Sequence, residues 1–328
     1  MGFLGMRDLS IIIVNWNTRD YLLNCIRSLM RSVGSSCEVI VVDNASQDGS
    51  ALEMKRLFPA VRLIENDSNL GFAKAVNQGL RVFSGKHALL LNPDTQVKEE
   101  TIEKLLIFME DHPEAGVAGV QLLNSDGTRQ NSIANFPSLA TELFNKRVLR
   151  WLFPERFPGK ERTYVEPIEV DSVIGACMMV RRKTMEEVGL LDEDYFLFLE
   201  ETDWCYRMKK AGWKVYHVPQ AEVIHFQGKS AEQDKKRSKV EYDRSRYLFF
   251  RKNKGPLPWF VLLIGVVMKL LVEVIYWTLI CSLTFFAHRK WKKKLSVVAN
   301  LLEWHLKGCP EGMGLKNEST KSQAPNSK

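Results

Sequence analysis

The stretch at residues 87–95, HALLLNPDT, determines how the rest of this 328-residue chain is arranged. Its first five residues are mostly aliphatic, which is typical of a central parallel strand buried on both faces. Pro93 has no N–H for a sheet ladder and pushes Asn92 towards an extended conformation, so we expect the strand to end there. Asp94 is then presented at the carboxyl end of the strand, the edge at which open α/β sheets bind ligands.

A carboxylate at this position has two interpretations. It is suited to binding Mg²⁺ or Mn²⁺, ions that commonly accompany a diphosphate. It is equally suited to capping a helix, which we predict from about residue 99. The spacing alone does not distinguish the two, so the rest of the chain must.

Short apolar runs alternate with helical patterns through the first 122 residues. A capping box of Ser50 and Glu53 is predicted to open one of the helices, which continues through Phe58. This alternation indicates βαβ units and a mostly parallel sheet, so we predict an α/β fold of the nucleotide-binding type. No GxGxxG or Walker loop occurs, which argues against a dinucleotide enzyme or a P-loop ATPase. The predicted strands lie at residues 9–14, 39–42, 61–64, 88–92 and 117–122.

Polar residues follow four of these strands. One such ending is ordinary turn chemistry, because Asn and Asp side chains bond their own backbone. Four at the same edge of neighbouring parallel strands would line one polar crevice, so we predict a binding site there. The residues are Asn15, Asp43, Asn66 or Asp67, and Asn92 with Asp94.

The second half of the chain is less regular. We predict a loop-rich insert at about residues 125–170, followed by a strand at 173–180. Helices are predicted at 183–188 and 200–211, each closed by a glycine. Two short strands are predicted at residues 214–217 and 222–226.

The net charge of +7 is concentrated in basic runs of the last third of the chain: KKRSK (235–239), RKNK (251–254) and RKWKKK (289–294). Such runs are typical of a solvated face, an anionic lipid surface or a nucleic-acid site. Nucleic acid is the weakest of these, because the runs flank apolar sequence rather than aromatic-rich strands. The six scattered cysteines show no zinc spacing, and MGFLGMRDLS at the start lacks the features of a signal peptide. We therefore expect the α/β part to stay in a reducing cytoplasm.

Residues 259–286 are almost wholly apolar, interrupted by Lys269 and Glu273. About 20 such residues suffice to cross a bilayer. A single span would place one of the two flanking basic runs on the far side, against the positive-inside tendency. We therefore predict peripheral or re-entrant attachment to an anionic membrane surface. A buried helix in a soluble oligomer is the alternative.

Three acids, Glu200, Glu201 and Asp203, follow an aromatic run in YFLFLEETDWC (195–205). Carboxylates favour a helix N-terminus through its dipole alone. A carboxyl held beside apolar side chains can also have a raised pKa and act as a general base. These residues alone do not decide between the two roles.

Taken together, the motifs resemble those of the family 2 glycosyltransferases with the GT-A fold, particularly the bacterial rhamnosyltransferase-like branch. The resemblance covers about residues 8–255, and its motifs occur in the family's order and spacing. They are SIIIVNWNT (10–18), VIVVDNASQDGS (39–50), NLGFAKAVNQG (69–79), LLLNPDT (89–95), GACMMVRR (175–182), FLFLEETDWCYRMKKAGW (196–213) and HFQGKS (225–230).

The resemblance implies roles for individual residues. Asp94 matches the acid that meets the metal, Mg²⁺ or Mn²⁺, and His225 matches a histidine that completes the metal shell in some members. Glu201 matches the catalytic base, although Glu stands where the family usually has Asp, so Glu200 and Asp203 stay open as alternatives. Asp43 is expected to recognise the base or ribose of the nucleotide. The full set expected around the nucleotide sugar is Asn15, Asn17, Asp43, Asn69, Lys74, Asn92 and Lys229.

The implied domains are a GT-A catalytic domain at residues 1–255, membrane-associated helices at 256–308 and a disordered tail at 309–328. Within the first, residues 1–124 would form the nucleotide-binding half and 125–255 the acceptor half.

The implied function is inverting, metal-dependent transfer of a sugar, first of all from dTDP-rhamnose, in cell-envelope polysaccharide assembly. The expected acceptor is a polyprenyl-diphosphate-linked or glycan hydroxyl at the cytoplasmic face of the bacterial inner membrane, with no nucleic-acid partner. A nucleotidyltransferase is one alternative, although NWNTRD (15–20) has no glycine for the loop it needs. The other is a catalytically inactive membrane scaffold. Two departures from the family pattern leave room for it: Asn92 replaces the first acid of the family's Asp-x-Asp motif, and Glu201 stands where the family usually has Asp.

Overall fold

The computed structural model describes residues 9–33, 37–153, 163–226 and 235–317. The chain forms two compact units. The first, here called the sheet unit, comprises residues 1–136, 160–196 and 200–230. The second, here called the helical unit, comprises residues 137–159, 197–199 and 231–328.

The first half of the sheet unit is a series of parallel strands in the order β3-β2-β1-β4, joined by helices. Each apolar run that we predicted as a strand here forms one. The strands are β1 (Leu9–Asn15), β2 (Glu38–Asp43), β3 (Arg62–Glu65) and β4 (His87–Leu91). The helices are α1 (Arg19–Val33), α2 (Ser50–Leu57) and α3 (Phe72–Leu80).

The second half of the sheet is mixed. β10 (Cys177–Arg181) lies antiparallel between β4 and β6 (Ala115–Leu123). β11 (Lys214–His225) runs parallel to β6 and antiparallel to β5 (Thr95–Val97). The remaining elements of the unit are α4 (Thr101–Asp111), β7 (Ile133–Ala134), β8 (Ile168–Glu169), β9 (Ser172–Val173), α7 (Arg182–Val188) and α8 (Glu200–Lys210).

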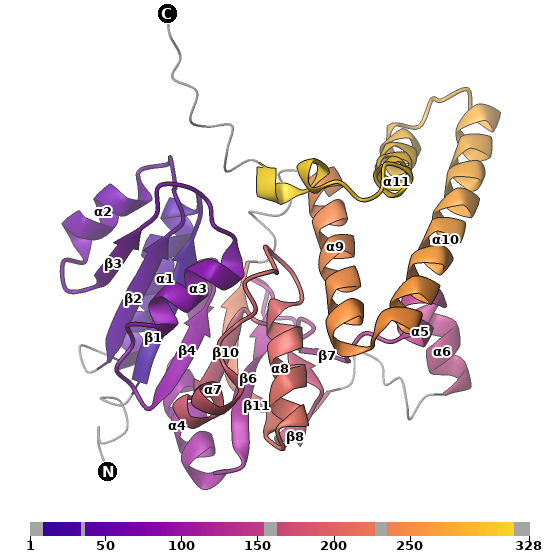
Figure 1. Cartoon of the computed structure of the whole chain (residues 1–328). Helices are drawn as coiled ribbons and strands as arrows, with labels where there is room; N and C mark the ends of the chain where they lie inside the picture. Colours follow the sequence, from indigo (N-terminus) through magenta and orange to yellow (C-terminus); the bar gives the residue numbers. More distant parts are fainter. Residues whose placement is uncertain (1–8, 34–36, 154–162, 227–234, 318–328) are drawn as a thin grey trace, which may run out of the picture. The chain divides into compact units, whose positions relative to one another are not determined.

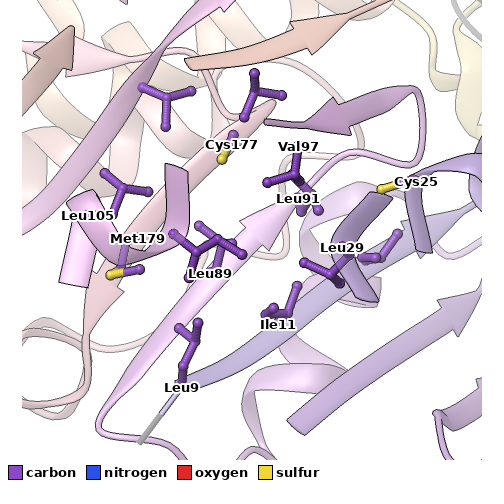
Figure 2. Packing of buried hydrophobic residues seen from close by; sticks show 14 of the residues in the cluster. Leu9, Ile11, Cys25, Leu29, Leu89, Leu91, Val97, Leu105, Cys177 and Met179 are labelled. Carbon is purple, nitrogen blue, oxygen red and sulfur yellow. The ribbon is translucent and has the colours of Figure 1, made fainter. Parts of the chain in front are cut away.

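Hydrophobic cores cover both faces of the sheet. Side chains of β1 alternate between the faces, so Ile11 and Ile13 point to one core while Ile12 and Val14 point to the other. The first core packs against α1 and α4, and Figure 2 shows its aliphatic and sulfur-bearing side chains gathered over β1, β4 and β10. The second packs against α3, α7 and α8, the helices drawn in front of the strands in Figure 1.

Three local predictions are wrong. The strand predicted at 173–180 is split into β9 and β10 by a turn at Gly175. The two strands predicted at 214–217 and 222–226 are one strand, β11, with a register shift after Val218 where Pro219 leaves the ladder. Ser50 is the first helical residue of α2 rather than its cap, because its N–H and hydroxyl bond to Asp48.

The helical unit contains a 28-residue helix, α10, that accounts for most of the predicted apolar segment. At about 1.5 Å per residue it is ~42 Å long. It is one continuous helix rather than a re-entrant hairpin, and most of its side chains are exposed. The helices of this unit are α5 (Leu139–Leu143), α6 (Lys146–Leu152), α9 (Lys235–Asn253), α10 (Pro256–Leu283) and α11 (Arg289–Leu306) (Figure 1). Two short 3₁₀ turns follow them, at Glu311–Met313 and Leu315–Asn317.

The interior of the helical unit contains ion pairs on α9. Arg246 forms ion pairs with Asp243 and Glu142, and all three side chains are at most 8% exposed. Glu241 accepts the N–H of Leu315, which binds the start of the predicted disordered tail to α9. That prediction is therefore wrong for residues 309–317, and the remainder of the tail lies outside the described residues. The structure also groups α9 with α10 and α11, whereas we predicted residues 235–253 to belong to the catalytic domain.

Candidate active site

The carboxyl ends of β1 and β2 bring two predicted site residues together. Asn15 and Asp43 are paired in register, and the Asn15 side-chain amide donates to Asp43 Oδ1 at 2.8 Å. The N–H of Ser46 donates to Asp43 Oδ2 at 2.9 Å. Both side chains are buried, so the carboxylate is held in one orientation at the edge of the sheet.

Asn17 and Asn69 organise the loops at the same edge. Asn17 has a positive φ of 52°, and its side-chain oxygen accepts the N–H of Gln47 at 2.7 Å, which joins the loops after β1 and β2. The side-chain oxygen of Asn69 accepts from Asn44 and from the N–H of Gly71. We did not predict a role for Asn44, although it directly follows Asp43. Lys74 is exposed in the first turn of α3.

Asp94 lies after β4 and directly before β5. Its backbone carbonyl accepts the N–H of Phe226, and its Oδ1 lies 3.4 Å from Nε2 of His225. Both side chains are buried. The N-cap of α4 is Glu100, separated from Asp94 by the strand β5, so the helix-capping interpretation of Asp94 is wrong.

The pair Asp94 and His225 fits a divalent cation that takes its remaining ligands from elsewhere. Two ligands cis to one another around an octahedral ion at 2.0–2.1 Å lie about 3.0 Å apart, close to the distance observed here. In the described part of the chain, no group of three or more His, Cys, Asp or Glu side chains could hold a metal. Protein sites for Mg²⁺ commonly use one or two carboxylates and leave the other positions to phosphate and water.

The turn just before the antiparallel strand β10 lies between this edge and the acidic helix. The N–H of Asn92 donates to the carbonyl of Ala176, just before β10 begins opposite Leu91. The preceding residue, Gly175, faces the side chain of Glu201: a Cβ added at Gly175 would lie 3.4 Å from Cγ of Glu201. Asp94 and Glu201 are therefore linked through Asn92, Ala176 and Gly175.

Glu201 has the environment of a general base. Burial raises the pKa of its carboxyl, and hydrogen bonds from its own N–H and from Thr202 oppose the rise in part. Some of its surface remains exposed. A carboxylate of raised pKa that solvent can reach is better matched to accepting a proton near neutral pH than an ordinary glutamate.

The two alternative acids differ from Glu201. Asp203 is 2% exposed and pairs with Arg207 Nε at 2.9 Å, while the same guanidinium donates to the carbonyls of Val188 and Leu190. This bonding favours a structural role for Asp203. Glu200 is buried at the start of α8.

Two bulky residues with positive φ directly precede α8. Phe198 has φ 73° and Leu199 has φ 64°, a region that L residues with large side chains rarely adopt. Such strain costs about 1–3 kcal/mol per residue and clusters at active sites. No residue type in the sequence signals it, so sequence reasoning missed it. Lys229, the last of the predicted site residues, lies outside the described residues.

The mixed sheet with helices on both faces has the GT-A fold. Two solved structures share the fold: the mannosyltransferase PcManGT from Pyrobaculum calidifontis in complex with GDP-Man and Mn²⁺, and GalNAc-T7 with UDP, GalNAc and Mn²⁺. The first has a TM-score of 0.55 at 15% identity and covers 92% of this chain and 86% of that chain. The second has a TM-score of 0.51 at 17% identity and covers 76% and 51%.

The chain belongs to glycosyl transferase family 2, whose sequence model matches residues 10–189. It is 29% identical over 272 residues to an N-acetylglucosaminyl-diphospho-decaprenol L-rhamnosyltransferase of Mycobacterium tuberculosis, covering 76% of this chain and 88% of the relative. It is 27% identical over 221 residues to the dTDP-rhamnosyl transferase RfbF of Shigella flexneri, covering 65% and 67%. The predictions of the family and of the GT-A fold are confirmed.

Proposed function

We propose that this glycosyltransferase transfers rhamnose from dTDP-rhamnose to a polyprenyl-diphosphate-linked acceptor in cell-envelope glycan assembly, with inversion and with a divalent metal. The names of the relatives from Mycobacterium tuberculosis and Shigella flexneri support the sugar, and the first of them supports the acceptor class. One structural observation carries the proposal: the turn at Gly175–Ala176, just before β10, bonds to Asn92 beside the Asp94–His225 pair and faces Glu201.

The donor half of the site would use the ends of β1, β2 and β4. Asp43, fixed by Asn15 and Ser46, has further lone pairs with which to accept hydrogen bonds from a base or ribose. Asp94 and His225 would hold Mg²⁺ or Mn²⁺. When bound, the ion would supply positive charge to the departing nucleoside diphosphate. Mn²⁺ in both solved structures of the same fold supports a metal.

The acceptor half would use Glu201. As the acceptor oxygen attacks C1 of the sugar, its proton passes to the Glu201 carboxylate, and the bond between C1 and the diphosphate oxygen breaks. Attack from the face opposite the leaving group inverts the anomeric centre. Because an alcohol has a pKa far above neutrality, this step needs a base, and general-base catalysis typically contributes about 10²- to 10⁴-fold.

The helical unit would attach the enzyme to the membrane that holds its acceptor. Among the described residues α10 alone is long and apolar enough to cross a bilayer, and its apolar side chains are largely exposed. α11 begins with the basic run Arg289–Lys294, which suits an anionic surface. We place the enzyme at the cytoplasmic face of the bacterial inner membrane. We expect the full-length protein to float with vesicles that contain anionic lipid, and protein lacking residues 256–328 not to float with them.

Thermal unfolding of the detergent-solubilised protein with dTDP, UDP or GDP, each with and without Mn²⁺, tests the donor and the metal together. A ligand at a hundredfold excess over its Kd stabilises the folded state by about 2.7 kcal/mol. We expect dTDP to stabilise only with Mn²⁺, and Asp94→Ala to remove the effect. Stabilisation by UDP or GDP instead would refute the proposed donor. Rhamnose turnover that persists in Glu201→Gln would refute the proposed base.

A further inference from the structure

A chain of hydrogen bonds runs from an exposed aspartate to the imidazole of His225. Asp126 accepts from the Thr128 hydroxyl at 2.6 Å, and Thr128 Oγ1 in turn accepts from the Asn124 side-chain amide at 2.8 Å. Gln130 Nε2 donates to Asn124 Oδ1 at 2.8 Å. The last member is His225, whose Nδ1 lies 3.1 Å from Gln130 Oε1.

The donor and acceptor of each hydrogen bond follow from the Asp126 carboxylate, at which the chain begins. Hydrogen bonds from Thr128 lower the pKa of Asp126, so at neutral pH this carboxylate only accepts. Thr128 must then donate its single hydroxyl proton to Asp126 and accept a hydrogen bond from Asn124. The amide nitrogen of Asn124 is thereby turned to Thr128, and its oxygen to Gln130.

The orientation of Gln130 is fixed a second time. Its Nε2 also lies 2.6 Å from the backbone carbonyl of His225, an atom that can only accept. The nitrogen of this amide therefore faces Asn124 and the His225 carbonyl, and the oxygen faces the imidazole. Because an amide oxygen cannot donate, Nδ1 of His225 must carry a proton.

This assignment determines what the imidazole presents to Asp94. In a neutral imidazole one nitrogen carries the proton and the other a lone pair. With the proton on Nδ1, the lone pair is on Nε2, the atom 3.4 Å from Asp94 Oδ1. Two electron-pair donors then face one space, which suits a cation between them and is unfavourable without one.

We propose that Gln130 is a positioning residue that holds His225 in the Nδ1–H tautomer, so that Nε2 is ready to bind the divalent metal. This inference rests on the metal site of the proposed function and assigns a residue to it that lies outside every motif noted in the sequence. Partners of this kind, which bind the far nitrogen of a ligating histidine, are typically worth 10- to 100-fold in metal affinity or activity.

The tautomer can be measured without any metal. Two-bond ¹H–¹⁵N correlation spectra of ¹⁵N-histidine-labelled, detergent-solubilised protein at pH 8 distinguish the tautomers, and His225→Ala identifies the signals. We expect the Nδ1–H pattern for His225 in the wild type and the more usual Nε2–H pattern in Gln130→Leu. An Nε2–H or doubly protonated ring in the wild type would overturn the inference, as would no change in Gln130→Leu.

Binding of Mn²⁺, followed by the EPR signal of the free ion, tests the consequence. Gln130→Leu should weaken Mn²⁺ binding by about 10- to 100-fold in the wild-type background and have no further effect when combined with His225→Ala. Gln220→Leu removes another glutamine bond to a backbone carbonyl, on the same strand as His225, and should bind Mn²⁺ as the wild type does.

The two ideas fail differently. If Asp94→Ala abolishes Mn²⁺ binding while Gln130→Leu leaves it unchanged, the role of Gln130 is refuted and the metal site stands. If Asp94→Ala leaves Mn²⁺ binding unchanged, the proposed metal site itself is refuted, whatever the tautomer.

Discussion

Replacement of Gly71 by alanine tests how tightly the loop before α3 is packed against Phe196, five residues before Glu201. Gly71 has φ 85° and ψ 167°, a region open almost only to glycine, and this strain costs an alanine about 1–3 kcal/mol. An added Cβ would also lie 2.7 Å from both the backbone oxygen and Cδ2 of Phe196. Displacing a backbone atom is more costly than moving a side chain, and overpacking typically costs about 1–3 kcal/mol. We therefore expect Gly71→Ala to lower the free energy of unfolding by about 2–6 kcal/mol.

Gly49→Ala is the matched control, because Gly49 also has a positive φ of 83° but has nothing within 4 Å of an added Cβ. The left-handed conformation alone costs about 1–2 kcal/mol. Urea unfolding of the detergent-solubilised variants, followed by tryptophan fluorescence, gives both values. We also expect kcat to fall in Gly71→Ala, because the Phe72 N–H donates to the Phe196 carbonyl five residues before Glu201. Equal losses of stability in the two variants would refute the close packing described here.

Glu201→Gln should lower kcat by about 10²- to 10⁴-fold. Burial raises the pKa of Glu201 in the folded state, so the ionised carboxylate destabilises the fold. Glu201→Gln should therefore have a higher Tm than the wild type at pH 8, and the difference should disappear as the pH falls through the raised pKa. An unchanged or lower Tm at pH 8 contradicts this. Arg207→Ala leaves the Asp203 carboxylate buried without its cation, so the free energy of unfolding in urea should fall by about 3–5 kcal/mol. A fall of less than about 1 kcal/mol would show that the fold does not need the pair. Burial raises the pKa of Cys25 to about 12, so this thiol should not react with a thiol reagent at pH 8 until urea unfolds the chain. Fast labelling of Cys25 in the native protein would contradict its burial.

The elements that the sequence predicted well are those whose signal is local. β1, β2 and β4 are short apolar runs ended by Asn or Asp, and α1 repeats its apolar residues at helical spacing. The direction and partners of β10 could not be predicted in the same way. Cys177 pairs with Leu91, 86 residues earlier, and the composition of a buried strand does not state which neighbour it joins or in which sense.

The residues of the site also differ in whether the sequence could identify them. Asp94, His225 and Glu201 were identified because their motifs resemble those of a known family, and the structure brings the first two within 3.4 Å. Gln130 and Asn124 were not identified, because an Asn or Gln in a loop is ordinary turn chemistry until its bonds are seen. The positive φ of Phe198 and Leu199 was also beyond prediction, since it runs against the preferences of residues with large side chains.

The place of β10 in the sheet has a consequence for how the protein is made. β4 and β6 are not neighbours but lie on either side of β10, so the first 124 residues alone lack the strand that joins them. At about 5–20 residues per second, a ribosome needs roughly 5–20 s to proceed from the end of β4 to the end of β10. During that interval the apolar edge of β4 has no partner on that side and is open to pairing with another chain. The residues predicted as a nucleotide-binding half thus carry an unpaired strand edge until β10 has been made, and the enzyme acquires its site late in synthesis.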